Sequence, residues 1–186
     1  MFFSLVVDHG IIWDYNKRVN NFNGVNLMST RACYTFSDDR GDVHVYKHHD
    51  GYPYYAYQGG EAGGLIWIND AKDFAWGLPR FEADEFAASF VAANKDSGEH
   101  SGGGVRLINK KHPWEFASDC DYWYKVTTRK GELYVTVMSV DWWGEEPRQL
   151  PVMEGFLRTL LSTQREEALE KGYMIANTKR ARKEVA

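Results

Sequence analysis

Two runs of alternating side chains, at residues 29–37 and 42–48, constrain the fold of this chain more than any other feature. Neighbouring side chains of a β-strand point to opposite faces, so Tyr34 and Phe36 would share one face of the first run. The residues between the runs, Asp38-Asp-Arg-Gly41, are typical of a tight turn, because glycine adopts positive φ at little cost. We therefore predict that the two runs pair as an antiparallel β-hairpin.

Further strands and helices are expected downstream, where apolar residues recur at strand or helical spacing. The expected strands are 105–108, 121–128 and 132–140, of which the last two form a second hairpin around the turn Lys130-Gly131. The expected helices run from Glu61 to about Trp76, from about Arg80 to Asn94 and from Pro151 to Lys171. These elements predict an α+β fold, in which an antiparallel sheet of about five strands (two hairpins plus one strand) packs against two or three helices.

The two ends of the chain differ in pattern from its middle. Residues 1–27 are asparagine-rich and weakly patterned, whereas the strong alternation begins directly after Met28. This segment is either an extra edge strand or an extension outside the natural domain, and the pattern favours the second interpretation slightly. We predict a single domain over residues 28–172, followed by a basic tail over residues 173–186.

The composition narrows the classes of function. The 186 residues are enough for one domain with its own core, and they carry a formal net charge of −4 and a sequence pI of about 5.9, which argues against a nucleic-acid binder. No run approaches the roughly 20 apolar residues of a membrane helix, so we expect no membrane partner. The two cysteines, Cys33 and Cys120, form no spaced pair, so a disulfide framework is not expected and a reducing cytoplasm fits.

Three histidines and an aspartate at the end of the first hairpin suggest a metal site: His44, His48, His49 and Asp50. Strand geometry argues against it, because an advance of about 3.3 Å per residue places His44 and His48 roughly 13 Å apart on a straight strand. His48 and His49 point to opposite faces, and His48 with Asp50 would supply only two ligands, too few for zinc. We predict no metal ion and no cofactor.

Two motifs carry a resemblance to known sequences. The chain has Met28-Ser-Thr-Arg at the start of the first strand and Tyr46-Lys-His-His-Asp-Gly-Tyr-Pro53 at the end of the second. In this it resembles a family of uncharacterised bacteriophage and prophage proteins that begin Met-Ser-Thr-Arg and continue with Tyr-x-His-x-Asp-Gly-Tyr-Pro. Residues 78–95 are similar to the long form of that family, and the resemblance covers roughly residues 28–140. It implies a phage-type protein of the host cytoplasm but no particular activity.

The polar face of the first hairpin is the best candidate for a binding surface. Tyrosine, arginine and histidine on a rigid sheet are typical of recognition sites. The candidate binding residues are Arg31, Tyr46, His48, Asp50 and Tyr52. A phage-type protein with no visible catalytic motif is expected to bind a host protein or protein complex, for example to inhibit a host defence complex.

Other interpretations of the same residues remain open. The turn Asp50-Gly-Tyr-Pro could be a purely structural lock that His48 and Arg31 hold in place. A His48–Asp50 pair could act as an acid and base, and Ser29 could be the N-terminal nucleophile of a hydrolase if the mature chain began there. A virion structural protein, with residues 1–27 as an ordered arm, is a further alternative. We assign no catalytic residue.

Overall fold

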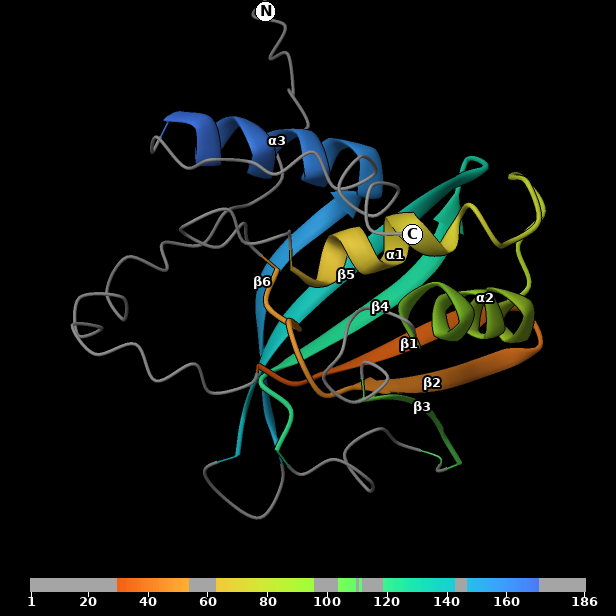
Figure 1. The fold of residues 1–186 in the computed structure, drawn as a ribbon, viewed down its shortest axis with the longest axis horizontal. Helices are drawn as coiled ribbons and strands as arrows, with labels where there is room; N and C mark the ends of the chain where they lie inside the picture. The colour runs from red at the N-terminus through yellow and green to blue at the C-terminus, as the bar shows by residue number, and fades with distance from the viewer. Residues whose placement is uncertain are drawn as a thin grey trace, which may run out of the picture.

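The computed structural model describes residues 30–53, 63–95, 104–109, 111, 119–142 and 147–170. Six strands form one sheet in the order β3-β2-β1-β4-β5-β6, and three helices cover it (Figure 1). The strands are β1 (Ala32–Asp38), β2 (Gly41–Lys47), β3 (Val105–Ile108), β4 (Tyr122–Arg129), β5 (Glu132–Asp141) and β6 (Arg148–Phe156). The helices are α1 (Gly64–Ala71), α2 (Ala83–Lys95) and α3 (Leu157–Glu170).

The predicted α+β class is confirmed, but the predicted antiparallel sheet of about five strands is wrong in detail. Strands β1 and β4 are parallel, with Ala32 opposite Tyr122. α1 and α2 lead the chain from β2 into β3 at the edge of the sheet, and the next strand along the chain, β4, lies on the other side of β1. The other neighbouring strands are antiparallel. The sixth strand, β6, occupies the residues where we expected the third helix to begin, and that helix starts only at Leu157.

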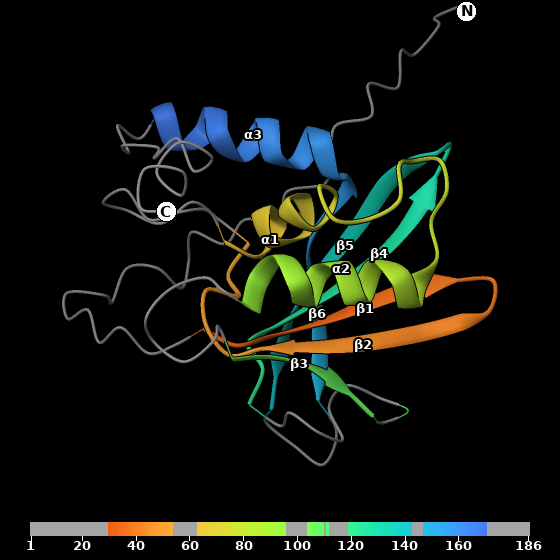
Figure 2. The ribbon, with the colours of Figure 1, turned by 45° about the vertical axis from the view of Figure 1, so that its right-hand side comes forward.

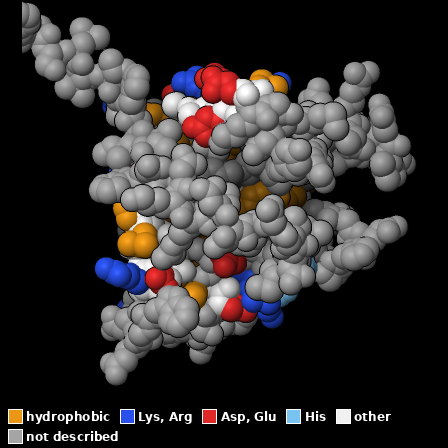
Figure 3. Space-filling model, turned by 90° about the vertical axis from the view of Figure 1, so that its left-hand side faces the viewer, with side chains coloured by type: hydrophobic (Ala, Val, Ile, Leu, Met, Phe, Trp, Pro, Cys, Tyr) orange, Lys and Arg blue, Asp and Glu red, His pale blue; other side chains and the backbone are white. Residues whose placement is uncertain are grey.

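All three helices lie on one face of the sheet (Figures 1 and 2). α2 packs over β1, β2 and β3, α3 packs over β5 and β6, and α1 lies between the two helices. The main core fills this interface, with the rings of Phe36 and Phe86 centred 5.4 Å apart and those of Tyr34 and Phe90 4.5 Å apart. The outer side of α3 bears charged side chains such as Glu166, and charged atoms gather at the upper edge of the face in Figure 3.

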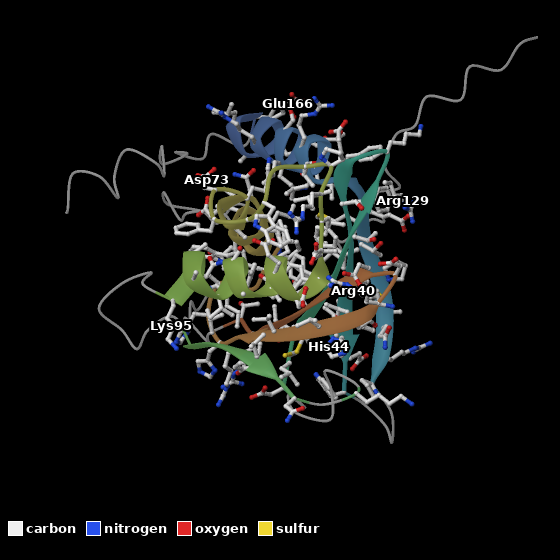
Figure 4. All side chains as sticks on the ribbon, turned by 90° about the vertical axis from the view of Figure 1, so that its right-hand side faces the viewer. Arg40, His44, Asp73, Lys95, Arg129 and Glu166 are labelled. Carbon is white, nitrogen blue, oxygen red and sulfur yellow. The ribbon has the colours of Figure 1, made fainter. Side chains whose placement is uncertain are left out.

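A second, smaller apolar cluster lies on the opposite face of the sheet. Its buried members are Cys33, Tyr46, Ile108, Cys120 and Trp123. His44 points to this same side, away from α2, as Figure 4 shows. The side chains of the hairpin therefore alternate between the two faces of the sheet, as predicted. Both faces are buried, because apolar side chains cover the polar face as well. No described helix is long and apolar enough to span a membrane.

Candidate functional site

Arg31, immediately before β1, lies at the centre of the candidate site. Its guanidinium Nη1 is 2.8 Å from a carboxylate oxygen of Asp119. Its backbone N–H donates to the Asp121 carboxylate at 2.9 Å, and its backbone carbonyl accepts from the Asp121 N–H at 2.9 Å. Arg31 is thus tied at both its backbone and its side chain to the segment that enters β4, and about a third of its side chain remains exposed.

His48 extends this site from the end of β2. The Tyr46 hydroxyl lies 2.7 Å from His48 Nδ1, and Arg31 Nε lies 3.4 Å from the same atom. Because Arg31 Nε–H can only donate, Nδ1 accepts, the Tyr46 hydroxyl donates, and the imidazole proton is on Nε2.

The environment of this pair favours neutral side chains. Burial lowers the pKa of His48 below its ordinary value, and the nearby His49 and Arg31 add to this effect. Burial also raises the pKa of Tyr46 to about 12, with a further contribution from the Asp119 carboxylate. The result is a neutral hydroxyl–imidazole pair beside a fixed guanidinium.

Two residues that we did not predict complete the site. Arg106, opposite Tyr46 in β3, places its guanidinium 5.1 Å from the centre of the Tyr46 ring. Asp119 holds Arg31. The alternation of residues 105–108 could have indicated that Arg106 shares a face with the polar side of the hairpin, but no local pattern connects Asp119 with Arg31. Gly104, just before β3, allows the backbone to lie close to His48, because a Cβ at residue 104 would overlap the Cβ of His48.

Asp50 and Tyr52 lie apart from this cluster. Asp50 has a positive φ of 56°, and its backbone carbonyl accepts a hydrogen bond from Trp67 Nε1 at 3.0 Å. Tyr52 packs against the helix-side core, and its carbonyl accepts from the Gly64 N–H. No hydrogen bond or ion pair between His48 and Asp50 is present among the described residues. The structure therefore brings together Arg31, Tyr46 and His48 of the five candidates.

Part of the polar face of the first hairpin is buried. Only 3% of Tyr46 and 5% of His44 is exposed to solvent. Trp123 Nε1 donates to the Thr35 hydroxyl at 2.7 Å, Thr35 lies 2.8 Å from His44 Nδ1, and His44 Nε2 lies 3.2 Å from the carbonyl of Lys111. Every polar group in this hydrogen-bond network has a partner when the Thr35 hydroxyl donates to His44 Nδ1 and the His44 Nε2–H donates to the Lys111 carbonyl.

The two cysteines meet in the same region of the sheet. Cys33 Sγ and Cys120 Sγ are 3.1 Å apart although 87 positions separate them in the chain. The neighbouring Cys33 thiol and burial together raise the pKa of Cys120 far above its ordinary value. Sequence spacing alone could not have placed them together. Groups of three or more His, Cys, Asp or Glu side chains able to hold a metal ion are absent from the described residues.

Some of our predictions fall on residues outside the described part of the chain. These are Ser29, the segment 1–27 and the tail over residues 173–186. Comparisons with family models, with curated proteins and with solved structures found no match to this chain. The resemblance to phage proteins therefore stays a prediction.

Proposed function

We propose that this protein acts by binding a host protein through the surface around Arg31 and His48. The observation that carries the proposal is the restraint of a partly exposed arginine by Asp119, Asp121 and His48. A side chain that is already fixed loses little conformational entropy on binding, and arginine is among the residues that contribute most at protein interfaces.

The surroundings of Arg31 favour a protein partner with acidic groups. Arg106 is exposed on the adjacent edge strand, and His49 is half-buried beside His48, with the two imidazole rings centred 4.5 Å apart. The planar guanidinium group of arginine matches the geometry of carboxylates. Asp119, about half exposed, adds a negative charge that would discriminate among partners.

The resemblance to phage proteins suggests where such a partner is found. A phage-type protein in the host cytoplasm would act by binding a host complex. We propose that this complex is a host defence complex, which the protein inhibits. The five residues predicted from the sequence then have different roles. Arg31 and His48 would contact the partner, and the hydroxyl of Tyr46 would hold the His48 ring in place. Asp50 and Tyr52 would fix the turn that follows β2.

Affinity purification from host lysate, followed by titration calorimetry with the purified partner, tests this proposal. We expect Arg31→Gln to weaken binding about tenfold or more, since a central arginine is removed. Arg158→Gln, in an exposed arginine of α3, is the matched control and should bind as the wild type does. Thermal melting of each variant establishes that it is folded. A partner that binds both variants with equal affinity would overturn the proposed site.

The defence-inhibitor form needs a test in cells. In bacteria that carry a defence system directed against a chosen phage, expression of the wild-type protein should restore plaque formation, whereas expression of the Arg31→Gln variant should not. Restoration by both proteins would show that inhibition does not use this surface. Failure of the wild-type protein across strains with different defence systems would contradict the inhibitor role.

A further inference from the structure

We propose that Cys33 and Cys120 form a redox modification site, in which a hydroperoxide or a small disulfide converts the two thiols into an intrachain disulfide. The inference goes beyond the proposed binding function and rests on different residues. It depends on the separation of the two sulfur atoms, on how the backbone holds them, and on their burial in the cluster opposite the helices.

The two sulfur atoms are close to bonding distance. They lie 3.1 Å apart in the reduced protein, and a disulfide bond is about 2.05 Å long. A combined movement of about 1 Å would therefore close the bond. Only 2% of Cys33 and 3% of Cys120 is exposed, so each sulfur has the other as a neighbour rather than solvent.

The backbone around both cysteines is held by neighbouring strands. Cys33 is in the centre of the sheet, paired with Tyr46 in β2 and with Trp123 in β4. Cys120 lies between two residues that bind Arg31, and its own carbonyl accepts a hydrogen bond from Trp142 Nε1 at 2.7 Å. Folding therefore supplies the proximity of the thiols, which raises the equilibrium constant for the disulfide relative to the same two thiols in a flexible chain.

The reaction balances with a hydroperoxide as the two-electron oxidant. One thiolate attacks the peroxide oxygen, the O–O bond breaks, an alcohol leaves and a sulfenic acid forms. The second sulfur then attacks the sulfenic sulfur, the S–S bond forms, the S–O bond breaks and water leaves. With a small disulfide as the oxidant, the first thiolate breaks its S–S bond and releases one small thiol, and the second thiolate then displaces the other small thiol from the mixed disulfide. Burial and the raised pKa of Cys120 keep the thiolate population small, so the reaction is slow in the closed native state and speeds up when the cluster opens.

The disulfide would join two segments that are distant in sequence. It would close the loop that contains β2, α1, α2 and β3, and it would fasten β1 to the entry of its parallel neighbour β4. A loop of this length restricts the unfolded chain strongly, so we expect oxidation to raise Tm by on the order of 10 °C.

Refolding in glutathione redox buffers is the experiment that tests the inference, because it removes the barrier of burial. After acid quenching, alkylation with N-ethylmaleimide in denaturant and intact-mass measurement count the remaining thiols. We expect a monomer lighter by two hydrogen atoms, with no maleimide added and a Cys33–Cys120 cross-linked peptide. Cys33→Ser and Cys120→Ser should each give only a mixed disulfide with glutathione.

Three results would overturn the inference. They are a wild-type protein that carries two glutathione adducts, one that forms intermolecular dimers, and one that keeps two alkylatable thiols when refolded with oxidised glutathione alone. A melting comparison of the oxidised and reduced wild-type protein gives an independent readout. A lower Tm after oxidation would show that the bond distorts the sheet, and would also count against a built-in site.

Discussion

The carboxylate of Asp38, at the end of β1, accepts a hydrogen bond of 2.8 Å from the backbone N–H of Ala83, the first residue of α2. The two residues are 45 positions apart. Asp38 also accepts from the backbone N–H of Arg40 in its own turn, at 2.8 Å. One side chain therefore fixes the hairpin turn and caps the helix that packs over it, so the hairpin and α2 are joined at this point.

Removal of this cap should destabilise the protein. We expect Asp38→Ala to lower Tm because the N–H groups of Ala83 and Arg40 lose their acceptor. Asp38→Asn should lower Tm less, since the amide oxygen can still accept a hydrogen bond. The exposed neighbour Asp39 provides the control, and Asp39→Ala should leave Tm nearly unchanged. Differential scanning calorimetry of the three variants checks the order, and equal losses for Asp38→Ala and Asp39→Ala would contradict it.

The same carboxylate should make stability depend on acid. Hydrogen bonds from the Ala83 and Arg40 backbones lower the pKa of Asp38 from 3.8 to about 2. Between these two pH values the unfolded chain binds the proton more readily than the folded chain, so protonation favours unfolding. The contribution of Asp38 is complete above 3.8 and is lost as the pH falls to about 2. Urea unfolding over this range should show a shallower loss for Asp38→Asn than for the wild type; parallel curves would argue against it.

Thr35 should be important for stability because it connects Trp123 with His44. Thr35→Val keeps the shape of the side chain but leaves the Trp123 N–H and His44 Nδ1 without their partner in a buried site. We expect a loss of about 2 kcal/mol in the free energy of unfolding. Thr136→Val, in the half-buried part of β5, is the matched control and should change it by less than about 0.5 kcal/mol. Urea denaturation followed by tryptophan fluorescence provides both values.

Gly64 should tolerate no side chain. Tyr34 and Tyr124 stack with ring centres 4.6 Å apart, and a Cβ at Gly64 would overlap both hydroxyl oxygens. We expect Gly64→Ala to cost about 3 kcal/mol of stability, despite the better helix propensity of alanine. At Gly77 a Cβ would meet no atom within 4 Å, so Gly77→Ala should be neutral or slightly stabilising. Similar melting temperatures for the two variants would refute the packing argument.

The protonation of His48 should report on the Arg31 site. Its pKa is lowered from 6.5, and the Tyr46 hydroxyl donates to the neutral imidazole. Tyr46→Phe removes a hydrogen bond that only the neutral form can accept, so the pKa of His48 should rise. Arg31→Gln removes a nearby positive charge and should also raise it. Titration of the imidazole signals by NMR measures these shifts, and an unchanged or lower pKa in Tyr46→Phe would contradict the assigned tautomer.

Local pattern was sufficient to predict the first hairpin and α2. Strict alternation over 29–37 and 42–48 has a structural match in β1 and β2, because a period of two residues fits only a strand. Apolar residues at helical spacing, such as Phe86 and Phe90, likewise predicted α2, although the helix begins at Ala83 rather than at about Arg80. β6 was missed because its buried pair, Val152 and Met153, is too short a run to distinguish a strand from the first turns of a helix.

The candidate site was predicted only in part. Arg31, Tyr46 and His48 could be grouped because the hairpin register brings the start of one strand beside the end of the other. Asp50 and Tyr52 were grouped with them by proximity in the chain, but the positive φ of Asp50 turns the backbone toward the helices. The alternation of residues 105–108 could indicate the face on which Arg106 lies, but not that it is opposite Tyr46. Asp119 comes from a segment far along the chain, and no local spacing indicates its contact with Arg31.

The sequence by itself therefore determined what is local: the α+β class, the two hairpins, α2 and the acidic turn that includes Asp38. Only the tertiary structure decided which strands outside the two hairpins are neighbours, and so which distant side chains meet. The parallel pairing of β1 with β4 places Asp119 against Arg31 and Cys120 against Cys33. Such pairings follow from the burial of whole faces of the sheet. This burial depends on all the helices and strands together, so the residue pattern of a single segment does not indicate it.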